Sequence, residues 1–113
     1  MSFASSDNPP ERIFQLAQTA KGSALASREE FLNALDYFRK MRVYPHTVEA
    51  YEMDGELERL NLECSILGLD KNSEYYPDAA NENNFDLATL KIEASKECKY
   101  PVKFKIWVDA IDD

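Results

Sequence analysis

The apolar positions in the first part of the chain recur every three or four places, which is the spacing of one face of an α-helix. A first helix is predicted from Pro9 to about Gly22. Asn8 and Glu11 have the spacing of a capping box at its start, and a glycine such as Gly22 is typical of a helix end.

A second helix is predicted to begin after Ser27, because Ser27 and Glu30 also have the spacing of a capping box. Basic residues in its last turn complement the negative end of the helix dipole, and Pro45 disfavours helix at the residue before it. The apolar stripe expected to face the core consists of Phe31, Leu32, Leu35, Phe38 and Met41.

After Pro45 the apolar period changes to two, which indicates β-strands. Thr47–Met53 is predicted to be a strand, Asp54 and Gly55 are a strong signal for a two-residue hairpin turn, and Leu57–Leu67 is predicted to be the returning strand. The pattern leaves open which face of the first strand points inward, and a bulge near the turn would reconcile its two candidate faces.

A second hairpin is predicted at the end of the chain, where Leu90–Ala94 and Val102–Val108 alternate between apolar and polar residues. A short polar turn at residues 96–101 would join them. The segment from Gly68 to Asp86 has no steady period; a turn of helix around Pro77–Glu82 is one interpretation of it.

These elements predict an α+β fold in which two N-terminal helices pack on one face of a four-stranded, mainly antiparallel sheet made of two hairpins. Residues 1–8, rich in Ser, Asp and Asn, are predicted to be a flexible tail, which leaves 9–113 as a single domain. The alternative is a strongly curved sheet that encloses a ligand pocket with the helices.

Negative charge is concentrated in the middle of this 113-residue chain. Residues 43–86 contain eleven acids and two bases, whereas the segments before and after have balances of +1 and 0, so this segment accounts for the formal charge of −8. Such a surface repels nucleic acid and anionic membranes and attracts basic surfaces. A basic protein partner is therefore expected, with no direct nucleic-acid or membrane contact.

No motif for catalysis, metal binding or a cofactor stands out. Asp70, Asn72 and Glu74 alternate like the first ligands of an EF-hand loop, but the glycine and the final glutamate of that loop are missing. With His46 as the single histidine, no histidine cluster can hold a metal. A non-catalytic protein without metal or cofactor is the expectation.

The two cysteines, Cys64 and Cys98, are too few for a secreted disulfide framework. Cys64 is expected in the core and Cys98 in a turn. The N-terminus lacks the basic start and apolar run of a secretory signal, and no apolar stretch approaches the ~20 residues of a membrane span. A cytoplasmic location is expected.

The favoured function is an acidic interaction protein of the inhibitor, immunity or nucleic-acid-mimic type, whose carboxylates occupy a basic site of the partner. The predicted contact residues are four acids of the first hairpin and two tyrosines that follow it: Glu49, Glu52, Glu56, Glu58, Tyr75 and Tyr76. A pocket-containing ligand-binding domain or enzyme is the first alternative.

Trp107 supports a second alternative, a homo-oligomeric assembly component. If the apolar residues of 102–108 face the core, Trp107 lies on the opposite face of the sheet with Lys103 and Lys105. Tryptophan is enriched at the centres of protein interfaces, although the stems of the two lysines would also pack on an isolated ring.

Overall fold

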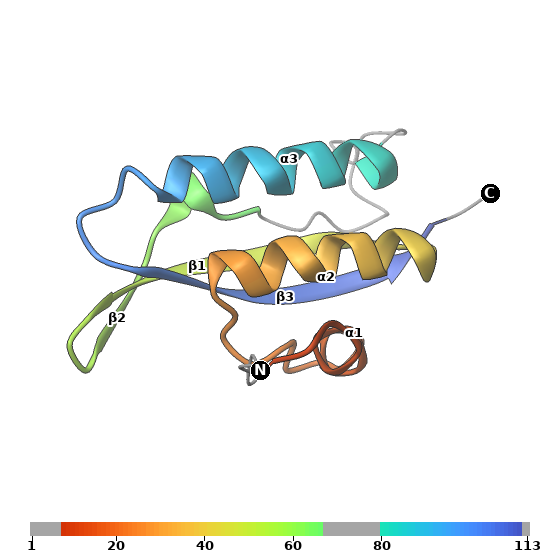
Figure 1. The fold of residues 1–113 in the computed structure, drawn as a ribbon, viewed down its shortest axis with the longest axis horizontal. Coiled ribbons are helices and arrows are strands. Elements are labelled where there is room, and N and C mark those ends of the chain that lie inside the picture. The colour runs from red at the N-terminus through yellow and green to blue at the C-terminus, as the bar shows by residue number, and fades with distance from the viewer. Residues whose placement is uncertain (1–7, 67–79, 112–113) are drawn as a thin grey trace, which may run out of the picture.

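The computed structural model describes residues 8–66 and 80–111, which form an α+β fold of three helices and one antiparallel sheet (Figure 1). The elements, in chain order, are α1 (Pro10–Ala17), α2 (Arg28–Lys40), β1 (Val43–Asp54), β2 (Leu57–Leu60), the 3₁₀ turn η1 (Leu62–Cys64), α3 (Ala80–Ser95) and β3 (Val102–Ala110). Of the tail expected at 1–8, only Asn8 lies within the described residues.

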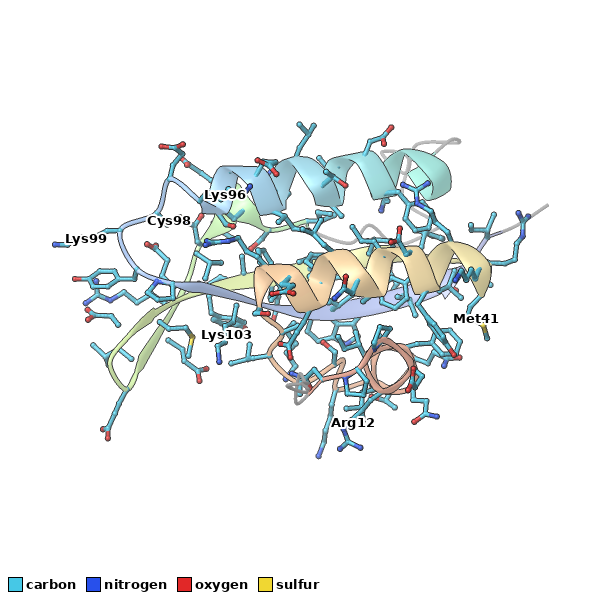
Figure 2. All side chains as sticks on the ribbon, in the orientation of Figure 1. Arg12, Met41, Lys96, Cys98, Lys99 and Lys103 are labelled. Atoms are coloured by element: carbon cyan, nitrogen blue, oxygen red, sulfur yellow. The ribbon has the colours of Figure 1, made fainter. Side chains whose placement is uncertain are left out.

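The second predicted helix is confirmed as α2, and so is its capping box. The backbone N–H of Glu30 donates to Ser27 Oγ at 3.2 Å, and the backbone N–H of Ser27 donates to Glu30 Oε1 at 2.8 Å. The inner face differs from the predicted stripe, because Leu32 and Met41 are 40% and 43% exposed, and Figure 2 shows Met41 at the end of the helix. The buried residues of α2 are Phe31, Ala34, Leu35 and Phe38.

Helix α1 is shorter than predicted and is not capped by Asn8. Its N-cap is Pro9, with no side-chain cap hydrogen bond, because the Asn8 side chain instead donates to the carbonyl of Leu25 at 2.8 Å. The helix ends at Ala17, well before Gly22. Figure 1 shows α1 end-on below α2, where it contacts both α2 and β3.

The sheet has the order β2-β1-β3, and every neighbouring pair is antiparallel. Val48 pairs with Ile106 and Ala50 with Phe104, so these four side chains point to the same face, where α2 and α3 lie. The face of β1 that the sequence left open is therefore decided. Strand β1 also begins earlier than predicted, at Val43, with its register irregularity after Pro45 and not near the hairpin turn.

The free edge of β3 is covered by the segment between α1 and α2. Ala26 exchanges two backbone hydrogen bonds with Phe104, each 2.8 Å long. Ser23 completes the pairing, since its N–H donates to the Ile106 carbonyl at 3.0 Å and its hydroxyl accepts from the Ile106 N–H at 2.9 Å. A serine hydroxyl thus takes the place of a backbone carbonyl at this edge.

The predicted strand at Leu90–Ala94 is wrong, and with it the second hairpin and the four-stranded sheet. These residues belong to α3, in which Ile92 is fully buried while Leu90 is 65% exposed. Apolar residues lie on both the inner and outer faces of α3, so the helical period is hidden and a period of two appears instead. The buried residues of α3 are Phe85, Ala88, Ile92 and Ser95.

The two helices that cover the sheet are consequently α2 and α3, and not the two N-terminal helices. Figure 1 shows α3 running beside α2 on the same side of the sheet. Arg39 of α2 stacks over the ring of Phe85 in α3, with its guanidinium carbon 4.3 Å from the ring centroid. The predicted α+β class is correct, while the strand number and the helix placement are corrected.

The returning strand of the first hairpin is also shorter than predicted. It ends at Leu60, after which η1 begins, and Ile66 then pairs with Val48 through two backbone hydrogen bonds of 2.8 and 2.9 Å. Leu62 is 62% exposed because it lies in η1 and not on the inner face of a strand. Residues 67–79 lie outside the described part of the chain. The last residues of the irregular segment predicted from Gly68 to Asp86 are helical, since α3 begins at Ala80, within the turn of helix considered around Pro77–Glu82.

Replacing Leu35 by Ala tests the packing of α2 on the sheet. Leu35 is 4% exposed, so we expect a loss of about 2–5 kcal/mol in the free energy of unfolding through lost burial and a residual cavity. Leu32→Ala is the matched control, because it removes the same atoms from a side chain that is 40% exposed. Denaturant unfolding measures both; equal losses would contradict the packing described.

Candidate interaction surface

The β1–β2 hairpin projects from the body of the molecule (Figure 1). Its two strands pair from Tyr51 with Leu60 to Asp54 with Leu57, and all four residues of β2 are exposed. The predicted tight turn with positive φ at Gly55 is confirmed, with a φ of 63°, but its two-residue loop is Gly55 and Glu56 and not Asp54 and Gly55, because Asp54 is still paired with Leu57.

The outer edge of this hairpin combines apolar and acidic side chains. Leu57, Leu60 and Leu62 are 57%, 49% and 62% exposed, and the exposed Glu56 and Glu58 precede and follow Leu57 in the chain. Glu58 and Leu60 point away from α2 and α3, whereas Leu57 points to the opposite face of the hairpin. We call these five residues the hairpin edge. An exposed strand edge also presents backbone N–H and C=O groups that a partner can pair with.

The four predicted acidic contact residues do not share one face. Glu49 and Glu58 lie on the outer face of the sheet, away from α2 and α3, whereas Glu52 lies on the opposite face and accepts a hydrogen bond from Asn61 Nδ2 at 3.3 Å. Glu56 lies at the turn. The structure therefore brings Glu56 and Glu58 together at the hairpin edge and separates them from Glu52.

Basic residues distant in sequence lie next to part of the acidic segment. Lys105 of β3 is opposite Glu49, and Lys103 is opposite Tyr51. Figure 2 shows Lys103 on the side of the sheet away from α2 and α3. Within the hairpin, Arg59 forms a 3.1 Å ion pair with Asp54. Among the described residues, the charge imbalance along the sequence is thus reduced in space on the outer face.

Tyr51 lies beside the acids of the outer face and is hydrogen-bonded to one of them, Glu49. Its hydroxyl donates to Glu49 Oε1 at 2.6 Å. This hydrogen bond, followed by partial burial and by the negative charges of Glu49 and Glu58, raises the pKa of Tyr51 to about 12. Tyr51 remains a neutral donor at physiological pH and holds Glu49 against the sheet.

Trp107 lies on the outer face, as predicted, but the α1–α2 connection covers part of its ring. Its indole N–H donates to the carbonyl of Ala20 at 3.0 Å, and a Cβ built on Gly22 would lie 2.6 Å from the ring. Lys105 Nζ is 6.0 Å from the ring centroid. Tyr75 and Tyr76, the other predicted aromatic contacts, lie outside the described residues.

Asn61 has a structural role at the base of the hairpin that the sequence pattern concealed, since it falls on the wet side of an apparent strand. Its N–H donates to Ala50 at 2.8 Å, and its Oδ1 accepts from the Cys64 N–H at 3.1 Å to cap η1. Its Nδ2 reaches both Glu52 and Cys98 Sγ, the latter at 3.4 Å. The preference of Asn for N-cap positions was the available signal.

The depressions found on the described part of the protein are at its surface. One of about 340 Å³ lies between the start of α2 and the start of β3, with Ser27, Arg28, Glu29, Pro101, Val102 and Lys103 as its lining. Within residues 8–66 and 80–111, no three His, Cys, Asp or Glu side chains are grouped to hold a metal ion. No helix in these ranges is long and apolar enough to cross a membrane.

Alkaline pH should destabilise the fold through Tyr51. Its folded pKa of about 12 lies above the ordinary value of 10.0, so the unfolded chain releases the phenol proton first. The stabilising contribution is complete below pH 10 and is lost as the pH rises toward 12. Tyr51→Phe should reduce the fall of the unfolding free energy with pH in this window. Identical slopes for both proteins in denaturant unfolding would contradict this role.

Gly22→Ala should destabilise the protein by about 1–3 kcal/mol, because the added methyl group meets the Trp107 ring and φ is +77°. The control is Gly55→Ala, where φ is +63° but no atom lies within 4 Å of the new methyl group, so only the backbone cost applies. Thermal or denaturant unfolding, followed by the fluorescence of the single tryptophan, compares them. An equal effect at both glycines would exclude the proposed Trp107 contact as the cause.

Comparison with known proteins does not add a family assignment, since no protein-family model and no curated protein matches this chain.

Proposed function

We propose that this chain is a non-catalytic interaction protein that docks on a basic protein partner through the β1–β2 hairpin. The observation that carries the proposal is the hairpin edge, where exposed leucines adjoin Glu56 and Glu58 on a projecting strand. Apolar side chains provide the buried centre of such a contact, and the surrounding carboxylates provide its charge complementarity.

The physical role proposed is that of an inhibitor, an immunity protein or a nucleic-acid mimic. In such a complex the carboxylates occupy a positively charged site of the partner, where they replace phosphate groups. Long-range attraction accelerates the encounter, while the apolar contacts made afterwards determine how slowly the complex dissociates. The expected cytoplasmic location and the absence of direct nucleic-acid or membrane contact belong to this proposal.

The four acids do not contribute equally to the proposed contact. Glu56 and Glu58 are exposed, whereas Glu49 accepts a hydrogen bond from Tyr51 and lies opposite Lys105. Glu52 is bonded to Asn61 at the hairpin base. The proposal therefore gives the largest electrostatic role to Glu56 and Glu58, with Glu49 and Glu52 as weaker contributors.

The two alternatives have less support from the geometry. A pocket-containing ligand-binding protein or enzyme would use an enclosed cavity, but the described depressions are at the surface and Phe31, Phe38 and Phe104 fill the space between α2 and the sheet. A homo-oligomer through the outer sheet face would use Trp107, whose N–H and part of whose ring already have partners within the chain.

A partner isolated with the intact chain permits a direct test of the docking surface. Neutralising Glu56 and Glu58 to Gln should lower the association rate constant by roughly three- to tenfold at low salt, and added salt should lower it for the wild-type protein. The control pair is Glu11→Gln with Asp36→Asn, which changes the net charge equally at exposed positions on α1 and α2. Surface plasmon resonance over a salt series measures both rate constants.

Replacing Leu57 and Leu60 by Ala should mainly accelerate dissociation, because apolar contacts form after the encounter. Tyr75→Ala with Tyr76→Ala should have the same effect, because both tyrosines are proposed as aromatic anchors of the contact. Salt-independent association that is unchanged by the Glu56 and Glu58 substitutions would eliminate docking through the hairpin edge. Loss of binding on Trp107→Phe alone would favour the outer sheet face instead.

A further inference from the structure

The two cysteines meet although they are far apart in sequence. Cys64 ends η1, and Cys98 lies in the connection between α3 and β3, which Figure 2 shows with Lys96, Cys98 and Lys99 labelled. Both are free thiols. The side chain of Asn61 bridges them, since its Oδ1 accepts from the Cys64 N–H at 3.1 Å and its Nδ2 donates to Cys98 Sγ at 3.4 Å.

The two thiols are near enough for Cys98 to affect the titration of Cys64, and they differ in exposure. Burial raises the pKa of the Cys64 thiol to about 11, and the charge of Cys98 and a side-chain hydrogen bond with it contribute in the same direction. Cys64 is 2% exposed, while Cys98 is half-buried. Cys64 therefore keeps its proton at neutral pH, and Cys98 is the thiol that an oxidant in solution can reach.

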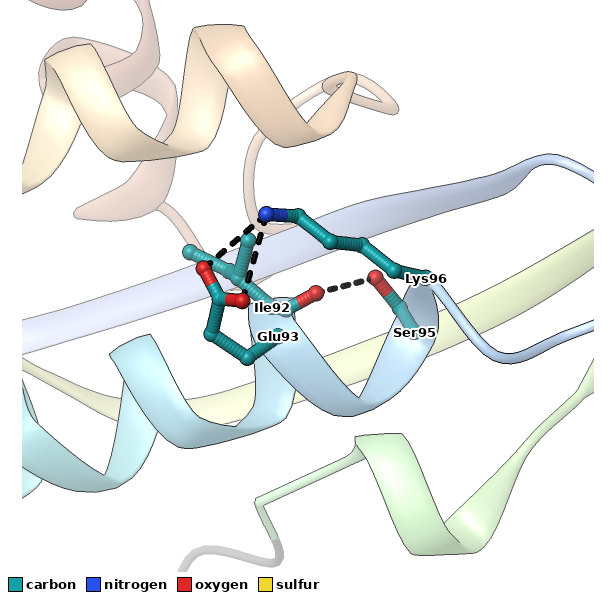
Figure 3. Close-up of polar contacts among 4 residues, drawn as sticks. All are labelled: Ile92, Glu93, Ser95 and Lys96. Atoms are coloured by element: carbon teal, nitrogen blue, oxygen red, sulfur yellow. Dashed lines mark hydrogen bonds and ion pairs between the residues drawn. The ribbon is translucent and has the colours of Figure 1, made fainter.

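Hydrogen bonds anchor both segments that contain the cysteines, η1 with Cys64 and the α3–β3 connection with Cys98. Lys91 Nζ of α3 donates to the carbonyl of Glu63 in η1 at 2.7 Å, which ties the helix to the turn. At the end of α3, Ser95 Oγ donates to the Ile92 carbonyl at 2.6 Å and Lys96 Nζ contacts Glu93 at 3.1 Å (Figure 3). The N–H of Cys98 then donates to the Ser95 carbonyl at 3.2 Å. The segments that carry Cys64 and Cys98 are therefore each anchored by hydrogen bonds to α3.

We propose that Cys64 and Cys98 are an oxidation site that forms a reversible intramolecular disulfide on reaction with a hydroperoxide. The observation behind it is the single amide of Asn61 that contacts both cysteines. This inference does not depend on the docking function, because it concerns thiol chemistry of the chain alone.

The reaction balances in two steps with hydrogen peroxide as oxidant. The Cys98 thiolate attacks one peroxide oxygen, the O–O bond breaks, and Cys98 sulfenic acid forms with release of hydroxide. The Cys64 sulfur then attacks the Cys98 sulfur, the S–O bond breaks, and the thiol proton leaves with the hydroxyl group as water. The two cysteine sulfurs lose two electrons in total, and the peroxide gains them.

Asn61 acts in this chemistry as a positioning residue. Its amide holds the accessible sulfur of Cys98 against the turn that carries Cys64, which favours the second step over further oxidation of the sulfenic acid. A disulfide here would connect η1, directly after β2, to the end of α3. In a reducing compartment such a bond is transient, as redox-responsive disulfides are.

The test uses the reduced, full-length protein treated with hydrogen peroxide, followed by alkylation of the remaining thiols and intact-mass analysis. The expected product is a monomer that has lost two hydrogens, takes up no alkyl group and regains both free thiols on treatment with dithiothreitol. Two alkylated cysteines after a peroxide exposure that oxidises a small thiol in the same solution would overturn the proposal. Disulfide-linked dimers as the only product would also overturn it.

Single substitutions distinguish the role of Cys98, which is oxidised first, from that of Cys64, which then forms the disulfide. Cys64→Ala should accumulate Cys98 sulfenic acid, trapped by dimedone, and Cys98→Ala should leave Cys64 reduced because it is buried. Asn61→Asp keeps an acceptor for the η1 cap but loses the N–H that reaches Cys98, so disulfide formation should slow by about fivefold or more while circular dichroism stays unchanged. Oxidation of Cys64 in Cys98→Ala at the wild-type rate would refute the order of reaction. An unchanged rate in Asn61→Asp would refute the positioning role.

Discussion

The antiparallel pairing of β1 with β3 is the interaction on which the rest of the structure depends. It extends from Val43 with Ala110 to Glu52 with Val102 and joins residues that lie 67 to 50 positions apart in the sequence. Because side chains alternate along paired strands, this one register places Val48, Ala50, Phe104 and Ile106 under α2 and α3. It also places Glu49, Lys105 and Trp107 on the outer face.

Short irregular segments pair with both outer edges of the β1–β3 pair. At each edge a serine hydroxyl accepts a backbone N–H that a strand carbonyl would accept in a regular sheet. Ser23 accepts the Ile106 N–H on one edge, and Ser65 accepts the Ala50 N–H at 3.0 Å on the other. Ser65 in turn donates to the Asn61 carbonyl at 2.7 Å. Among the described residues, no buried side-chain nitrogen or oxygen lacks a hydrogen-bond partner. Three serines are consequently buried at little energetic cost.

The pairing of β1 with β3 also makes the distribution of charge in space differ from its distribution along the sequence. Along the sequence, residues 43–86 are strongly acidic, but the β3 lysines Lys103 and Lys105 lie across from β1. Among the described residues, the outer face is therefore of mixed charge, while the exposed Glu56 and Glu58 lie at the hairpin edge. The proposed docking site and the proposed thiol site meet at the base of this hairpin, since Asn61 contacts both Glu52 and Cys98.

Local signals were sufficient for several elements. The capping box at Ser27 and Glu30, the helical stripe that follows it and the turn at Gly55 each depend on residues within a few positions of one another, so the sequence by itself determined α2 and the hairpin turn. The strict alternation from Val102 to Val108 likewise determined β3 and the outward side of Trp107. The hairpin acids were identified from the sequence, but their separation onto two faces was not.

Only the tertiary structure decided α3, the covering of the β3 edge and the meeting of the cysteines. Apolar residues on both sides of α3 conceal the helical period, and packing of Phe85, Ala88 and Ile92 against α2 and the sheet selects helix there. Ser23–Ala26 has no strand pattern of its own and becomes ordered because β3 offers it unpaired backbone groups. Cys64 and Cys98 are brought near one another by the packing of α3 and the pairing of β1 with β3. No local sequence pattern predicts a contact between residues so far apart in the chain.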